Sequence, residues 1–236
     1  MHMVRELEEA RPIHFFEVGA GFGMLAYLLG HARQRLLNLV DVQSFAIIDH
    51  PSALDLQRWY LNHTLGSRVE IRRWPDGGAE PRDDEDAFGN TPDHKTPLEL
   101  WPPNGLAPSD PLRVELVPRE ERDLFIHAYS DAHATKSDAG PVGSASLRPL
   151  RILVAVNSLH EFGYPEFYWY FNTFVAGPEW MAAADYILYV SNIEWHGNAK
   201  KVKMLTSWPG FEVVSYRASK ITEWRLLRRT GGRAAA

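Results

Sequence analysis

The chain has 236 residues and a net charge of −5, with 25 lysines and arginines against 30 aspartates and glutamates. This length fits one large domain with a sizeable core, and the acidic balance argues against a protein that holds nucleic acid through its phosphates. No apolar run is long enough to span a bilayer, and the first residues lack the apolar core of a signal peptide. The absence of cysteine excludes disulfides, thiolate zinc sites and a cysteine nucleophile. We therefore expect a cytoplasmic protein that binds neither nucleic acid nor a membrane.

Strand and helix patterns alternate from the start of the chain. Residues 13–18 read as an apolar strand, the glycines of residues 19–23 break it, and residues 24–29 begin a helix. A second apolar strand at residues 44–49 is followed by Pro51, which suits the first turn of a helix. Two such units in succession predict an α/β protein with a doubly wound, mostly parallel sheet.

The middle of the chain leaves two choices open. Residues 69–73 and residues 112–117 compete for the third strand of the sheet. Residues 123–130 and residues 151–158 compete for the fourth strand. The second candidate is favoured for the fourth strand because a helix pattern opened by Pro165 follows it directly.

Two segments between these strands do not read as regular elements of the core. Residues 75–111 contain eight of the 16 prolines and an acidic run, and they predict an insertion that we interpret as a flap. A Gly/Ser-rich linker is expected at about 135–149.

The last part of the chain contains three strand patterns, at residues 185–190, 211–216 and 222–227. The last two have no helix pattern between them, so we expect them to pair antiparallel at the end of the sheet. The whole chain, residues 1–236, is therefore predicted to form a single domain.

The strongest local motif is a glycine turn that contains Glu17, Gly19, Gly21 and Gly23. Glycines let a backbone approach a ligand closely, and the helix that follows offers free N–H groups. A dinucleotide fingerprint would have its third glycine at the position of Met24, and the carboxylate of Glu17 would repel a pyrophosphate. A zwitterionic or cationic ligand fits better, and the alternative is a tight turn in which Glu17 is a capping acid.

Asp49 ends the second predicted strand, and ligands of open α/β sheets bind outside the carboxyl ends of the strands. The two oxygens of a carboxylate match the two hydroxyls of a ribose. The alternative is an N-terminal cap for the helix that starts at Pro51, and both roles are compatible. Glu17 and Asp49 together predict a nucleoside ligand that carries no phosphate.

On these residues the chain resembles the class I S-adenosylmethionine-dependent methyltransferases. The match covers residues 13–65 well and residues 151–229 in outline. In that superfamily the acid of the first strand and the glycine turn contact the methionine part of the cofactor, and the acid of the second strand holds the ribose. The resemblance therefore implies a seven-stranded Rossmann-like sheet and the cofactor S-adenosyl-L-methionine. The implied cofactor-binding residues are Glu17, Gly19, Gly21, Gly23 and Asp49.

Two longer motifs are similar to those of a family of sugar O-methyltransferases. The first covers residues 47–61 and includes His50, and the second is Asn157-Ser158-Leu159-His160-Glu161-Phe162. Family members usually carry an Asn-Ser-x-x-Glu-Met-like motif after the fourth strand, and Phe162 stands here in place of the methionine. The resemblance implies a small polyhydroxylated acceptor, such as a sugar or a glycosylated metabolite. It also adds His50, Asn157 and Ser158 to the cofactor-binding residues.

The second motif carries the candidate catalytic residues. Transfer of a methyl group to a hydroxyl is an in-line displacement, and some group must take the hydroxyl proton. His160 has a suitable ordinary pKa for a general base, and Glu161 is expected to orient it or to hold the acceptor. The alternative is that His160 packs beneath the next helix while Glu161 caps that helix.

Other interpretations of the sequence remain open. A methyltransferase-like protein that binds cofactor, or acts as a partner subunit, would carry the same motifs without catalysis. A nicotinamide-dependent oxidoreductase is disfavoured by Met24 and Glu17. No HExxH motif is present, so a metal site built from His127, Asp131 and His133 is disfavoured as well. The sequence leaves homo-oligomerisation open.

A dense aromatic stretch follows the second motif. Its residues at helical spacing are expected to pack in the core: Phe167, Tyr170 or Phe171, and Phe174. Tyr164, Tyr168 and Trp169 would then point elsewhere and are the candidates for the wall of an acceptor pocket. Core packing alone is the alternative for these three residues as well.

Overall fold

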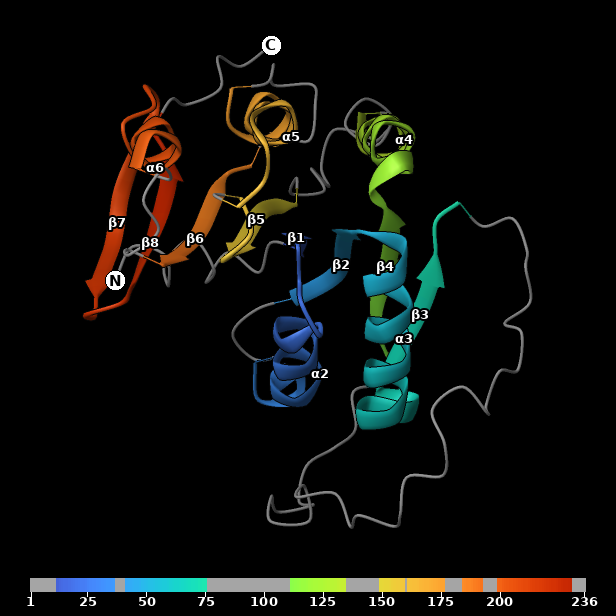
Figure 1. The fold of residues 1–236 in the computed structure, drawn as a ribbon. Helices are drawn as coiled ribbons and strands as arrows, with labels where there is room; N and C mark the ends of the chain where they lie inside the picture. The colour runs from blue at the N-terminus through green and yellow to red at the C-terminus, as the bar shows by residue number, and fades with distance from the viewer. Residues whose placement is uncertain are drawn as a thin grey trace, which may run out of the picture.

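The computed structural model describes residues 12–36, 41–75, 111–134, 149–159, 161–176, 184–192 and 199–230. Within them, strands and helices form an α/β fold around one mixed eight-stranded sheet (Figure 1). Apart from their end residues, the expected insertion at 75–111 and the linker at about 135–149 lie outside the described residues.

The sheet has the strand order β3-β4-β2-β1-β5-β6-β8-β7. Its strands are β1 (Pro12–Val18), β2 (Asp41–Asp49), β3 (Val69–Arg73), β4 (Leu112–Pro118), β5 (Leu150–Val156), β6 (Tyr186–Asn192), β7 (Phe211–Ala218) and β8 (Thr222–Arg229). The neighbours from β3 to β6 are parallel, whereas β8 runs antiparallel to both β6 and β7. The predicted antiparallel pair at the end of the chain is confirmed.

The expected count of seven strands is wrong, because both candidates for the third strand are strands. β3 and β4 pair in parallel, with Ile71 opposite Val114, and β4 pairs in turn with β2. The two segments are therefore not alternatives, because both belong to the sheet. The extra strand, β3, forms an edge of the sheet outside β4.

The two candidates for the fourth strand differ in structure. Residues 150–156 form β5, as the favoured interpretation predicted, and α5 (Tyr164–Tyr170) follows with Pro165 in its first turn. The competing segment lies in a helix, α4 (Arg122–Ala134). Phe125, Ile126 and Tyr129 recur there at helical spacing, and the first two are buried in the core, which explains why this apolar run is not a strand.

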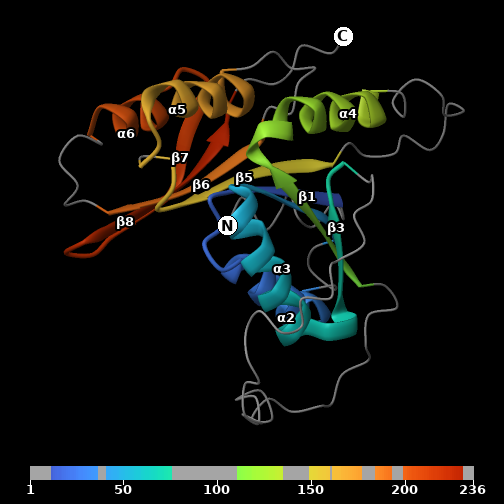
Figure 2. The same cartoon turned by 45° about the vertical axis from the view of Figure 1, so that its right-hand side comes forward.

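Helices cover both faces of the sheet (Figure 2). The helices α2 (Met24–Leu36) and α3 (Pro51–Leu65) lie on one face, and α4, α5 and α6 (Ala199–Thr206) lie on the other. Each face has its own cluster of buried residues, one around Phe45 and Leu61 and one around Phe16 and Phe174. None of the described helices has the length and apolar character that crossing a membrane requires.

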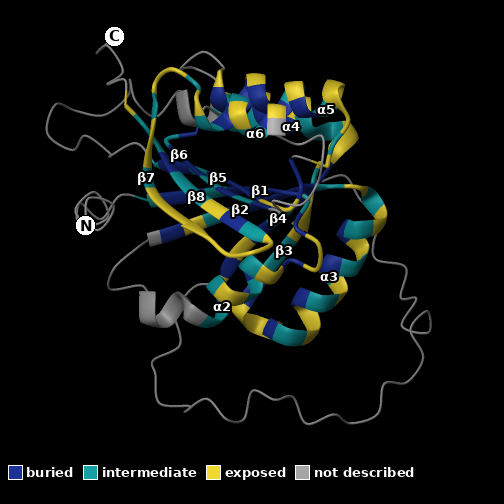
Figure 3. Ribbon diagram, turned by 60° about the vertical axis from the view of Figure 1, so that its left-hand side comes forward, coloured by how far each residue is buried: buried dark blue, intermediate teal, exposed yellow. Residues whose placement is uncertain are grey.

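The carboxyl ends of the central strands meet at one edge of the sheet. In the parallel register Val18 lies opposite Ile48, and Asp49 lies opposite Pro118. On the other side of β1, Glu17 lies opposite Val154, two residues before the end of β5. The segments that follow β1, β2, β4 and β5 therefore lie next to one another. The central strands that carry them are buried, whereas β7 at the far edge is largely exposed (Figure 3).

Candidate functional site

The glycine turn lies directly after β1, where the sequence predicted it. Gly19 and Gly21 have φ angles of 65° and 58°, in the region that favours glycine. A Cβ atom added to Gly21 would have nothing within 4 Å, whereas one added to Gly19 would lie 2.6 Å from Cβ of Ser158. The N–H of Gly19 donates to the carbonyl of Ile48 at 3.2 Å. The turn is therefore fixed at its base and faces open space at Gly21.

Glu17 lies beneath this turn as a buried acid. Its side chain is 3% exposed, and its Oε2 atom has no hydrogen-bond partner among the described residues. Burial, with a smaller contribution from the charge of Asp49, raises the pKa of Glu17 to about 8. The carboxyl of the ligand-free protein is therefore mostly protonated at neutral pH. A cation bound nearby would favour its ionised form.

Asp49 ends β2 with both carboxylate oxygens already oriented. Oδ1 accepts from the backbone N–H of His50 at 2.7 Å, and Oδ2 accepts from Nε2 of Gln57 at 2.8 Å. Each carboxylate oxygen has two lone pairs, so both oxygens keep capacity for a further donor. The half-buried side chain can therefore still accept from both hydroxyls of a vicinal diol.

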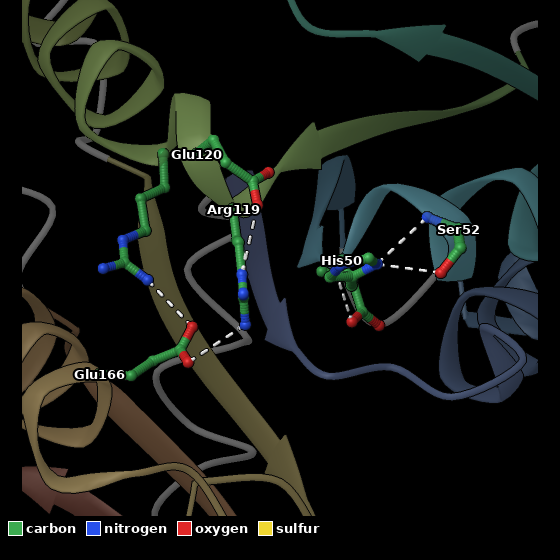
Figure 4. Close-up of polar contacts among 7 residues, drawn as sticks. His50, Ser52, Arg119, Glu120 and Glu166 are labelled. Atoms are coloured by element: carbon green, nitrogen blue, oxygen red, sulfur yellow. Dashed lines mark hydrogen bonds and ion pairs between the residues drawn. The ribbon is translucent and has the colours of Figure 1, made fainter.

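The expected cap of α3 is formed by the neighbouring residue. His50, and not Asp49, is the N-cap, and its Nδ1 atom accepts from the N–H of Ser52 at 3.4 Å (Figure 4). The same ring nitrogen lies 2.9 Å from Oγ of Ser52. The interpretation of Asp49 as the helix cap is therefore wrong. Its carboxylate lies at the carboxyl edge of the sheet and does not cap α3. Pro51 stands in the first turn, as predicted.

The segment after β5 lies against the glycine turn. Ser158 is buried, and its hydroxyl donates to the carbonyl of Val18, which ties the end of β5 to the end of β1. Asn157 is exposed with a positive φ of 52°, and Glu161 is exposed with its N–H donating to the carbonyl of Ser158 at 2.9 Å. His160 lies outside the described residues. The structure thus brings this segment next to the turn that carries Gly19.

A network of charged residues at the same edge was missed by the sequence interpretation. Arg119, which directly follows β4, lies 3.4 Å from Glu166 of α5 and 3.3 Å from Glu120 (Figure 4). Arg122 lies 3.1 Å from the other oxygen of Glu166. These ion pairs connect the start of α4 with α5. The open choice of third strand hid them, because only the placement of β4 beside β2 brings Arg119 to this edge.

This network changes the electrostatics of the neighbouring side chains. A backbone hydrogen bond, with smaller contributions from Arg119 and His50, lowers the pKa of Glu120. Burial raises the pKa of Tyr170 to about 12, although Arg122 favours its ionised form. Tyr170 therefore keeps its phenol proton at neutral pH and is not a candidate for the general base.

The aromatic stretch divides between core and surface. Phe167, Tyr170, Phe171 and Phe174 are all buried, which confirms the predicted core positions. Tyr164 and Tyr168 are exposed, and their rings stack with centroids 5.9 Å apart. Trp169 lies instead against α4, with the guanidinium of Arg122 at 4.1 Å from its ring and its N–H donating to Asp123.

The candidate metal ligands lie on a helix. His127, Asp131 and His133 all belong to α4, and the described ranges contain no group of three or more His, Cys, Asp or Glu side chains that could hold a metal ion.

Comparison with known proteins gives no assignment. No protein-family model matches the chain, and no curated protein matches it. The arrangement of residues at the carboxyl edge of the sheet therefore carries the functional interpretation.

Proposed function

We propose that the chain is an S-adenosyl-L-methionine-dependent O-methyltransferase with a doubly wound, Rossmann-like sheet. The observation that carries the proposal is the combination of an open glycine turn with two acids, Glu17 and Asp49, at neighbouring strand ends. The strand order runs outward in opposite directions from β1 and β5. In doubly wound sheets such a switch point is where ligands bind.

The residues at this edge fit a nucleoside cofactor that carries positive charge. Oε2 of Glu17 is a buried acceptor for which the described ranges provide no donor, which suits an ammonium group. Asp49 suits the ribose diol, and the open face of Gly21 leaves room for the ligand to approach the backbone. His50 follows Asp49 in sequence, and Ser158 lies against Gly19 with Asn157 next to it in the chain. These three residues complete the proposed cofactor site. When bound, the cofactor supplies a methyl group activated by a sulfonium.

The proposed chemistry needs a group that removes the proton of the acceptor hydroxyl. We assign this role to His160 and a positioning or acceptor-binding role to Glu161. His160 would take the proton of the acceptor hydroxyl as that oxygen receives the methyl group that the cofactor supplies. A small polyhydroxylated molecule, such as a sugar or a glycosylated metabolite, is the proposed acceptor class.

Calorimetric titration with S-adenosylhomocysteine, NAD and NADP tests the cofactor assignment. We expect micromolar affinity for S-adenosylhomocysteine and no measurable binding of the other two ligands. Preferential binding of NAD or NADP would support an oxidoreductase instead. Cofactor binding without methyl transfer to any polyol or sugar would support a non-catalytic role.

The role of Asp49 is tested by Asp49→Ala. The variant should bind S-adenosylhomocysteine about 1.5 to 3 kcal/mol more weakly, because charge-assisted hydrogen bonds to the ribose are lost. Asp55→Ala is the matched control, since Asp55 lies on α3 and pairs with Arg73 at the surface. Equal affinity of folded Asp49→Ala and wild-type protein would remove the ribose assignment.

The role of His160 is tested by kinetics. His160→Ala should keep its cofactor affinity and lose ~10²-fold or more in turnover, because proton transfer occurs in the transition state. The wild-type rate should fall as pH decreases through ~6.5, where an ordinary histidine becomes protonated. His127→Ala, an exposed position on α4, is the control. If His127→Ala abolishes activity and His160→Ala does not, the assigned base is wrong.

A further inference from the structure

Gln57 is a buried amide that connects the two halves of the candidate site. It lies on α3 and is 0% exposed. Its Nε2 atom donates to the carbonyl of Gly21 at 2.8 Å and to Oδ2 of Asp49 at 2.8 Å. One side chain thus contacts both the glycine turn after β1 and the acid that ends β2.

The chemistry of its neighbours fixes the orientation of this amide. A backbone carbonyl and a carboxylate both require donors, so Nε2 and not Oε1 must face them. With both amide protons used, Oε1 is left buried and without a hydrogen-bond partner among the described residues. Burying an unsatisfied polar atom costs free energy, so folding alone would not favour glutamine here.

The pattern of α3 supports the same conclusion. The buried residues of this helix are Leu54, Gln57, Leu61 and Leu65. Gln57 is the polar member of an otherwise leucine stripe that packs against the sheet. A leucine at position 57 would continue that stripe, which indicates that the amide is retained for its two hydrogen bonds.

We propose that Gln57 is a positioning residue for cofactor binding, which acts by holding the carboxylate of Asp49 in register with the glycine turn. This inference rests on the proposed function. The backbone N–H of His50 holds one carboxylate oxygen and Gln57 holds the other, so rotation of the carboxylate is restricted from both sides. The remaining lone pairs are thereby oriented before the ligand arrives, which lowers the cost of ordering the site on binding.

A double-mutant cycle tests this role, with affinity for S-adenosylhomocysteine measured by calorimetry. Gln57→Leu should bind about 10-fold more weakly than wild type. In an Asp49→Ala background the same substitution should change the affinity less than about threefold, because its effect passes through that carboxylate. The melting temperature of Gln57→Leu should equal or exceed that of wild type. Asn62→Leu, at an exposed amide of the same helix, should change neither the affinity for S-adenosylhomocysteine nor the melting temperature.

A second substitution keeps the shape of the side chain. Gln57→Glu retains the size of glutamine but removes both N–H donors and places a second carboxylate beside Asp49. It should weaken cofactor binding at least as much as Gln57→Leu does, because the same two donors are lost and a second carboxyl group lies beside Asp49.

The outcomes separate this inference from the proposed function. If wild-type protein binds no S-adenosylhomocysteine, both the proposed function and the role of Gln57 are overturned. If wild type binds and Gln57→Leu binds equally well, the role of Gln57 alone is overturned. An equal loss in both backgrounds would also overturn it, since Gln57 would then act independently of Asp49.

Discussion

Replacing Gly19 by alanine should destabilise the fold by about 3 kcal/mol or more, a large part of the stability of a typical domain. Two effects add. The new Cβ would lie 2.6 Å from Cβ of Ser158. That atom is bonded to the backbone of the segment after β5, and the Ser158 hydroxyl is hydrogen-bonded to Val18, so it cannot move aside without shifting this segment. The φ angle of 65° is also unfavourable for alanine, at a cost of roughly 1 to 2 kcal/mol. Urea denaturation of the two proteins measures the difference.

Gly21→Ala is the matched control for this prediction. Gly21 has nearly the same φ angle, 58°, but a Cβ there meets nothing within 4 Å. Gly21→Ala should therefore lower the free energy of unfolding by roughly 1 to 2 kcal/mol, from backbone strain alone. Equal destabilisation by the two substitutions would show that the packing of Ser158 against the turn is not as tight as the structure has it.

The elements nearest the N-terminus were predictable because their signals are local. Period and composition define β1 and β2 as buried parallel strands. The glycines of the turn and Pro51 then mark where each following helix starts. The acids at these strand ends could also be predicted, because parallel strands place their carboxyl ends at one edge.

The features that sequence interpretation missed depend on contacts between distant segments. Which of β3 and β4 is the third strand could not be decided from the sequence, because the pairing between them spans the expected insertion. In the sequence, the apolar positions of α4 are compatible with either a strand or a helix. The helix is favoured by a contact between distant segments, the packing of Phe125 in the core on one face of the sheet. Gln57 lies within the motif of residues 47–61, but the sequence does not show what its side chain contacts. Its hydrogen bond to the turn after β1 is visible only in the structure, where Nε2 lies 2.8 Å from the carbonyl oxygen of Gly21.

Two acids at neighbouring strand ends also impose a cost on the ligand-free protein. Glu17 is buried beside the charge of Asp49, and both effects disfavour a second negative charge. Asp49 accepts hydrogen bonds from two donors, whereas Oε2 of Glu17 has none among the described residues. The raised pKa of about 8 keeps a proton on Glu17 at neutral pH. A ligand ammonium group beside Glu17 would remove this conflict. S-adenosylhomocysteine carries such a group, so its affinity should rise with pH until Glu17 is ionised in the free protein.

The free energy of unfolding of the ligand-free protein should fall as pH increases from about 4.5 to about 8, through the Glu17 carboxyl. In the unfolded chain this group titrates near its ordinary value of 4.5, whereas in the folded protein its pKa is raised to about 8. Between these values the folded state binds one proton more than the unfolded state, so raising the pH favours unfolding. One such group contributes ~1.4 kcal/mol per pH unit within this window and nothing further above it.

Glu17→Gln isolates this contribution, because it keeps the shape of the side chain and cannot ionise. The difference in stability between the variant and wild type should be small near pH 4.5 and should grow in favour of the variant up to about pH 8. Urea denaturation at several pH values measures it. Glu121→Gln, on the short helical turn after β4, is the control and should follow wild type. If Glu17→Gln and wild type keep a constant difference from pH 4.5 to 8, Glu17 is already ionised in the folded protein. The conflict between the two acids would then be absent, and with it the expected rise of cofactor affinity with pH.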